Sequence, residues 1–170
     1  SGSSAIIACA MAILFSLSIN IAAQETHPSA VSPSQEIRIK EEVKLIIEKY
    51  YRYFSANEME KLPFETHNIP YSILGTGRAY TSVEQSNENY ANSIPNIKKE
   101  EPDYERSVFT IQNICVLSPL AAIASGFNTR KRTDGSIITI RGTSYILELT
   151  DNGWRISSFA STSLDKVVRC

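Results

Sequence analysis

The chain has 170 residues, of which 42% are hydrophobic, and a formal net charge of −1. This length and composition are typical of one globular domain with a sizeable core. The near-neutral charge gives no reason to expect nucleic-acid binding, since the only basic run, residues 130–132, lies at a predicted hairpin tip. No spacing of cysteines or histidines is typical of a metal site, so we expect neither a metal nor another cofactor.

Residues 1–23 have the pattern of a secretory signal peptide. The segment carries no charge, an apolar run covers residues 5–17, and after residues 18–21 the small residues Ala22 and Ala23 precede Gln24. We therefore expect cleavage near Gln24, a secreted or periplasmic protein, and no membrane attachment after cleavage. A signal anchor is the alternative, because residues 5–23 are just long enough to cross a bilayer. The rest of the chain divides into a linker (24–33), a domain (34–162) and a C-terminal tail (163–170).

An amphipathic helix is predicted to open the domain. Ser32 is the expected N-cap, Pro33 the first helical residue, and Gln35 completes a capping box with Ser32. Apolar residues then follow at helical spacing to about Ala56: Ile39, Val43, Ile46, Ile47, Tyr50 and Phe54. This face is expected to pack on the inner face of a sheet.

The chain between this helix and residue 106 is harder to assign. We expect, in order, a short helix over 57–62 before Pro63, irregular chain over 64–71, one glycine-interrupted strand over 72–80, a second helix from Thr81 or Ser82 to about Ser93, and a charged connector over 97–104. No phosphate-binding glycine loop is predicted, because the Gly75-Thr76-Gly77 sequence lacks the third glycine and a helix directly after it.

Four β-rich segments follow and predict a meander: 107–117, 120–132, 136–150 and 154–161. Asp134-Gly135 is a strong hairpin signal, because a type I′ turn needs positive φ at both central residues. With Thr133 opposite Ser136, one face collects Leu120, Ala122, Ala124, Gly126 and Asn128 with Arg141, Thr143, Tyr145, Leu147 and Leu149. The other collects Ile123, Ser125 and Phe127 with Ile138, Ile140, Gly142, Ser144, Ile146 and Glu148.

This register leaves space beside one aromatic ring. Tyr145 lies opposite Ala124 and next to Gly126, which makes room for a helix or a ligand on a concave face. The last hairpin has two possible registers. A loop of Asn152-Gly153 puts Ile156 on the Tyr145 face, and a three-residue loop puts it on the other face.

The order helix, helix, curved antiparallel meander is typical of α+β folds. It resembles the nuclear-transport-factor-2-like superfamily, which includes ketosteroid isomerases and SnoaL-like cyclases. Three motifs carry the resemblance: residues 67–71 (HNIPY), 117–121 (LSPLA) and 150–156 (TDNGWRI). It implies a curved antiparallel sheet, a cone with the N-terminal helices on its concave face and a pocket between them. The isomerases place an aspartate base in that pocket, but residues 71–80 hold no aspartate at a matching position.

His67 is the candidate acid/base, because it is the only histidine of the predicted domain and histidine titrates near neutral pH. The alternative is that its ring only hydrogen-bonds the local chain. Glu148 would be a desolvated base on the concave face and an ordinary solvated residue on the outer face, which we favour. Four residues are the candidate ligand-binding set: Tyr51, Tyr71, Arg141 and Tyr145. Arg141 and Tyr145 share a face and could hold an anionic or carbonyl-bearing ligand.

Two cysteines, Cys115 and Cys170, remain after the leader, either as free thiols or as a bridge. The apolar outer face with Phe127, Ile138 and Ile140 predicts a homodimer. Three functions are compatible with these residues. We favour an exported domain that binds a small apolar or carbonyl-bearing molecule, over a cofactor-free isomerase, cyclase or dehydratase using His67, and over a non-catalytic assembly module.

Overall fold

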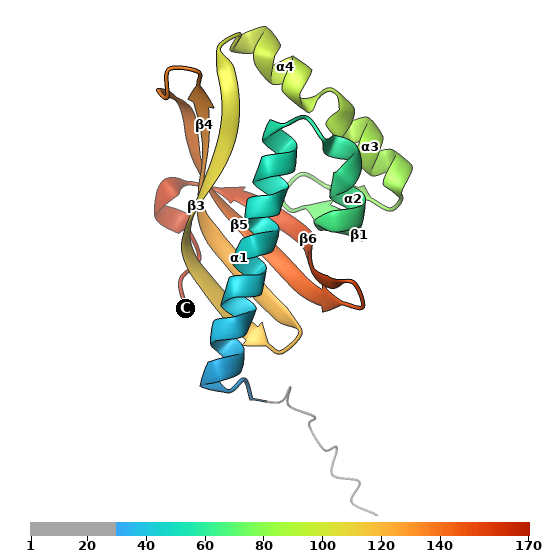
Figure 1. Ribbon diagram of the computed structural model, residues 1–170, viewed down its shortest axis with the longest axis vertical. Coiled ribbons are helices and arrows are strands. Elements are labelled where there is room, and N and C mark those ends of the chain that lie inside the picture. The colour runs from blue at the N-terminus through green and yellow to red at the C-terminus, as the bar shows by residue number, and fades with distance from the viewer. Residues whose placement is uncertain (1–29) are drawn as a thin grey trace, which may run out of the picture.

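The computed structural model describes residues 30–170, so the expected leader and its cleavage site lie outside the described residues. The elements are α1 (Pro33–Ser55), η1 (Met59–Lys61), α2 (Leu62–Glu65), β1 (His67–Ile73), β2 (Arg78–Tyr80), α3 (Val83–Ala91), α4 (Ser93–Glu100), β3 (Tyr104–Ser118), β4 (Ala121–Arg132), β5 (Ile137–Thr150), β6 (Gly153–Thr162) and η2 (Leu164–Lys166). Figure 1 shows α1 lying across one face of the curved sheet, with α3 and α4 near its C-terminal end. No helix of residues 30–170 is long and apolar enough to span a membrane.

The first helix begins and packs as its sequence predicts. Ser32 accepts a hydrogen bond from the Gln35 backbone, and the Gln35 side chain accepts one from the Ser32 backbone, so the capping box is complete. Pro33 is the first helical residue. The buried stripe is wider than predicted, because Tyr51 and Tyr53 join it: Ile39, Val43, Ile47, Tyr50, Tyr51 and Tyr53.

The six strands form one curved sheet in the order β2-β1-β6-β5-β4-β3. The expected α+β architecture is confirmed, with one addition to the antiparallel sheet. Strand β1 runs parallel to β6, while the other neighbouring strands are antiparallel. This parallel pairing is possible because the connection from β1 to β6 is long and contains the other strands and two helices.

Two predictions for the middle of the chain are wrong. Residues 64–71 are not irregular throughout, since β1 starts at His67, and residues 72–80 are not one strand. Gly75 and Gly77 have φ of +82° and +70°, so the chain reverses between β1 and β2 and forms a hairpin. The consequence is that Arg78 starts a separate edge strand.

The expected charged connector over 97–104 is also wrong, because α4 continues to Glu100. Pro95 does not stop the chain from being helical there. It is the third residue of α4, where its missing N–H would have had no partner within the helix. The same reason explains Pro63, which lies in the first turn of α2 rather than ending the preceding helix.

The predicted strand pairs of the central hairpin are confirmed, but its predicted two-residue turn is wrong. Ala124 lies opposite Tyr145, and Phe127 opposite Gly142. Arg132, not Thr133, bonds Ser136 across the turn, and only Gly135 has the positive φ that a type I′ turn needs at both central residues. A β-bulge between Arg130 and Lys131 restores the predicted pairs beyond it. The core face is the predicted one, with fully buried residues Ala122, Ala124 and Leu147.

The last hairpin places Trp154 and Ile156 in the core. Thr150 pairs with Gly153, whose φ of +89° suits glycine, and Ile156 lies opposite Leu147. Ile156 is therefore on the Tyr145 face, as in the first of the two alternatives, although the loop is Asp151-Asn152.

The C-terminal tail lies against the outer face of the sheet. A disulfide joins Cys115 to Cys170, which decides the alternative that the sequence left open. The Ser125 hydroxyl donates a 2.5 Å hydrogen bond to the Val168 carbonyl oxygen, and Val167 is buried. The tail therefore covers part of the outer face, which is the dimer interface predicted from the sequence.

Candidate functional site

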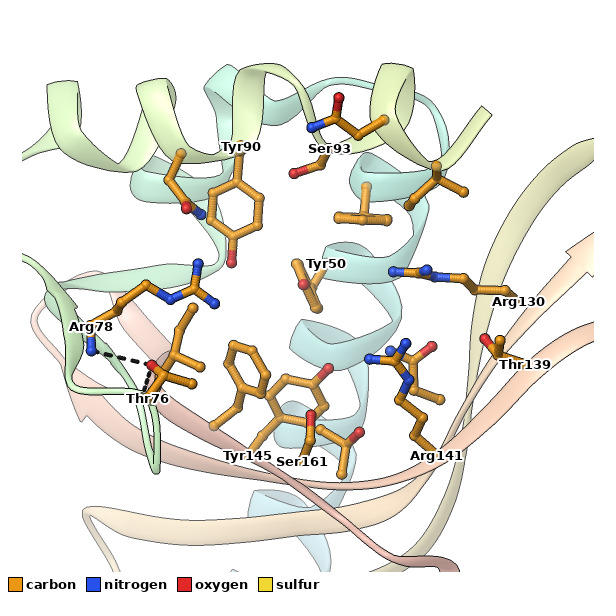
Figure 2. A pocket seen from close by; sticks show the side chains of 18 residues that line it. Tyr50, Thr76, Arg78, Tyr90, Ser93, Arg130, Thr139, Arg141, Tyr145 and Ser161 are labelled. Carbon is orange, nitrogen blue, oxygen red and sulfur yellow. Dashed lines mark hydrogen bonds between the residues drawn. The ribbon is translucent and has the colours of Figure 1, made fainter. Parts of the chain in front are cut away.

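A cavity of about 640 Å³ lies between the concave face of the sheet and the helices. Its residues come from α1, the β1–β2 hairpin, α3, α4 and strands β4, β5 and β6. Figure 2 shows their side chains converging from these elements. The cavity reaches solvent, since Arg78, Asn96 and Ser161 in its lining are exposed.

Aromatic rings form one wall of the cavity. Tyr50 and Phe54 come from α1, Tyr90 from α3, Tyr145 from β5 and Phe159 from β6. The rings pack on one another, with centroids 5.9 Å apart for Tyr50 and Tyr145 and 5.8 Å apart for Tyr145 and Phe159. Such a wall offers apolar contact to a carbon skeleton without needing to rearrange.

Three arginines, Arg78, Arg130 and Arg141, are the charged residues of the lining, which holds no Asp, Glu, Lys or His. In Figure 2, Arg130 and Arg141 reach in from one side and Arg78 from the opposite side. Arg130 and Arg141 come together because Asn128 pairs with Arg141, which makes Arg130 a diagonal neighbour on the same face. None of the three is within ion-pair distance of a carboxylate among residues 30–170.

Uncharged polar groups complete the lining. Ser93 and Asn96 lie on the first turn of α4, and Thr139 pairs with Arg130. The side-chain oxygen of Asn128 is buried and has no hydrogen-bond partner within residues 30–170. An unpartnered buried polar atom is costly, so a ligand group that bonds it would gain affinity.

Two of the predicted ligand-binding residues, Arg141 and Tyr145, line the cavity. Tyr51 and Tyr71 do not. The Tyr51 hydroxyl lies 2.6 Å from the Tyr145 hydroxyl, and its ring stacks on Phe109, so it supports Tyr145 from behind. Tyr71 is fully buried with its ring 4.3 Å from that of His67 and is part of the core.

His67 is buried behind the cavity wall rather than in it. Its Nδ1 lies 2.8 Å from the Thr66 hydroxyl and its Nε2 lies 3.2 Å from the Tyr90 hydroxyl. Burial lowers the pKa of His67 to about 3, so the ring is neutral at ordinary pH. Burial also raises the pKa of Tyr90, which does line the cavity, to about 12.

Glu148 lies on the face opposite Leu147, as favoured from the sequence. It accepts a hydrogen bond from the Asn68 side chain and pairs with Arg155 across the β5–β6 ladder. It is partly exposed and does not line the cavity.

Arg78 and Arg130 were missed by the sequence reasoning. Arg130 was assigned to a solvated turn, yet the predicted register already put it on the Arg141 face, so that signal was available. Arg78 had no such signal, because its position depends on the β1–β2 hairpin and on the fold around it.

Comparison with known families identifies the domain. A family model described as "NTF2-like protein (DUF6841)" matches residues 40–164, from within α1 to η2. The match covers the sheet, the helices on it and every residue that lines the cavity. Among curated proteins, no match to the chain was found.

Solved structures show the same fold at low sequence identity. An NTF2-like superfamily protein from Salmonella enterica has a TM-score of 0.55 and 18% identity, over 75% of this chain and 92% of that one. An NTF-2-like protein of unknown function from Shewanella oneidensis has a TM-score of 0.53 and 19% identity, over 72% and 98% of the two chains. An NTF2-like protein with a cystatin-like fold from Novosphingobium aromaticivorans has a TM-score of 0.55 and 15% identity, over 78% and 88%.

Proposed function

Since the chain belongs to the NTF2-like family DUF6841, we propose that it uses the cavity of this fold to bind a small organic molecule without converting it. The observation that carries the proposal is the composition of the lining. Aromatic rings, and arginines that form no ion pair within residues 30–170, supply apolar contact and strong hydrogen-bond donors. Among residues 30–170, the lining holds no Asp, Glu, His, Cys or Lys that could act as an acid, base or nucleophile.

The second candidate is a cofactor-free isomerase, cyclase or dehydratase that uses His67. One observation favours it: the His67 ring contacts the Tyr90 hydroxyl, and Tyr90 reaches the cavity. Binding alone is the better supported function, because a general acid or base works best with a pKa near the operating pH. Burial lowers the pKa of His67 to about 3 and raises that of Tyr90 to about 12. Both values lie far from neutral pH.

A cavity-filling variant tests the binding function. The full chain and its Ser161→Trp variant, with the new ring at the cavity edge, are screened against small organic compounds by thermal shift. Thr133→Trp, at the exposed β4–β5 turn, is the matched control. We expect compounds that stabilise the wild type and Thr133→Trp but not Ser161→Trp. Equal binding to all three proteins, or no binder at all, would contradict the proposal.

Export is a further part of the proposed function. Two observations support it: the uncharged, apolar residues 1–23 with small residues before Gln24, and the disulfide between Cys115 and Cys170. Disulfides persist in oxidising compartments and are rare in the cytosol. N-terminal sequencing of the periplasmic fraction after expression in a Gram-negative host should show a chain that starts near Gln24. An intact leader on a membrane-bound product would support the signal anchor instead.

A further inference from the structure

We propose that the ligand is an organic dianion whose two acidic groups bind at opposite sides of the cavity, one to Arg130 and Arg141 and the other to Arg78. This inference rests on the proposed function of the cavity and adds the chemical class of its ligand. Three features carry it: a pair of neighbouring arginines, a third arginine across from them, and an aromatic wall in between (Figure 2).

The arginine pair is a site for one acidic group. Two like charges on diagonal positions of neighbouring strands repel each other, and Arg130 is also partly buried. Burial lowers the pKa of Arg130, and the Arg141 charge lowers it further. The Glu100 charge raises this pKa, but by less than either of those effects lowers it. An acidic group between the two guanidinium groups would remove this repulsion. Their planar donors match the geometry of a carboxylate or phosphate.

Arg78 makes a separate site for the second acidic group. It starts the short edge strand β2, and its backbone N–H donates a 3.2 Å hydrogen bond to the Thr76 hydroxyl, which holds the turn. Figure 2 shows its side chain extending toward the cavity from the side opposite Arg130 and Arg141. A single acidic group bound at the pair would leave the donors of Arg78 free to bind a second one. A molecule with acidic groups at both ends satisfies all three arginines.

The space between the two sites sets the body of the ligand. Tyr50 and Tyr145 lie in that region (Figure 2), and Phe159 packs against Tyr145. These rings offer stacking contact to a carbon chain or a planar ring, and the Asn128, Thr139 and Thr143 side chains of the same lining can bond polar substituents on it. The proposed class is therefore a dicarboxylate, or an acid that carries a phosphate at its other end, on a carbon body that stacks on the rings.

Matched ligands test the two-ended arrangement. The full chain is titrated calorimetrically with α,ω-dicarboxylates from glutarate to sebacate, and with terephthalate. The best diacid is then compared with its own monomethyl ester, which has the same body and one charge fewer. We expect the half-ester to bind roughly tenfold or more weakly, because a hydrogen-bonded charge pair is lost. A diacid that carries one phosphonate shows which end prefers phosphate chemistry.

Single-arginine variants assign the two ends. Arg78→Gln should lower the affinity for the diacid about tenfold and leave the half-ester within about twofold, since its carboxylate uses the stronger pair. Arg141→Gln should weaken both ligands. Arg38→Gln, which removes the same charge from the exposed N-terminal half of α1, should change neither.

Several results would overturn the inference. They are equal binding of diacid and half-ester, no response of the diacid to Arg78→Gln, no binding anywhere in the series, or inorganic phosphate binding as tightly as the best diacid. The last result would mean a site for a simple inorganic anion.

The proposed function can be tested separately from the dianion inference. If neutral or singly charged compounds bind and Ser161→Trp abolishes their binding, the cavity is a ligand site and only the dianion inference is wrong.

Discussion

At the scale of single residues, the burial of His67 links stability to pH. Burial lowers its pKa from 6.5 to about 3, so the unfolded chain takes up this proton near pH 6.5 and the folded chain does not. The unfolded state therefore binds more protons between these values. The free energy of unfolding should fall as the pH decreases from 6.5, by up to ~1.4 kcal/mol per pH unit from this group.

Urea denaturation of the wild type and His67→Gln between pH 7 and pH 5 checks this prediction. The variant should be less stable at pH 7, because it loses the packing of the imidazole ring, but its stability should depend less on pH. His67 is the only histidine of residues 30–170, so no other imidazole of this part contributes to the difference. Parallel pH profiles for the two proteins would show that the imidazole titrates normally in the folded state.

At the scale of elements, one buried hydroxyl pair joins α1 to β5. The oxygens of Tyr51 and Tyr145 lie 2.6 Å apart, and both side chains are almost fully buried. The pair places α1 over the sheet and orients Tyr145 at the cavity wall. Its contribution depends on both partners, because either hydroxyl left alone would be buried without its bond.

A double-mutant cycle measures this link. Tyr51→Phe and Tyr145→Phe should each lower the free energy of unfolding by about 1–2 kcal/mol, and the double variant should lose less than their sum, with an interaction energy of about 1 kcal/mol. Urea denaturation of the four proteins gives the values. Additive losses would mean that the two hydroxyls find other partners and that the pair does not join the elements.

At the scale of the whole molecule, the disulfide holds the tail on the outer face. The bridge between Cys115 and Cys170 closes a loop with a sequence separation of 55. Loss of chain entropy in the unfolded state predicts that Cys170→Ser lowers the free energy of unfolding by up to about 4 kcal/mol. Urea denaturation checks this, with reducing agent as the control. The reductant should destabilise the wild type and leave Cys170→Ser unchanged, and equal midpoints without reductant would contradict the prediction.

The outer face also supports a prediction of self-association. Next to the area covered by the tail, Phe127, Ile138 and Ile146 are partly exposed, and Ile140 is 42% exposed. Sedimentation at micromolar concentration should show a dimer that Ile140→Lys dissociates, because a buried unpaired ammonium is costly. Ile37→Lys, at a 67% exposed position of α1, should leave the dimer intact. A wild type that sediments only as a monomer would contradict the prediction, including its version as an assembly module.

Features that depend on neighbours along the chain can be predicted without the structure. Ser32 and Gln35 cap α1 because their side chains reach backbone groups three residues away. Asp134-Gly135 marks the β4–β5 turn, and together with the bulge beside it gives the register that puts Arg141 and Tyr145 on the concave face. Local rules fail at Gly75 and Gly77, where the same residues are compatible with an interrupted strand or with a hairpin.

Features that depend on contacts between residues distant in sequence come from the packing of the whole domain. Arg78 lies across the cavity from Arg130 and Arg141 only because β1 pairs with β6, and no local pattern predicts that parallel pair. The same packing encloses His67 behind Tyr90, which removes it from the cavity and lowers its pKa by desolvation. Cys170 reaches Cys115 because the tail folds back over the outer face. Side chains become buried and converge only when the whole domain packs. The positive charge of the cavity and the neutral state of the His67 ring therefore follow from the tertiary structure and not from local sequence.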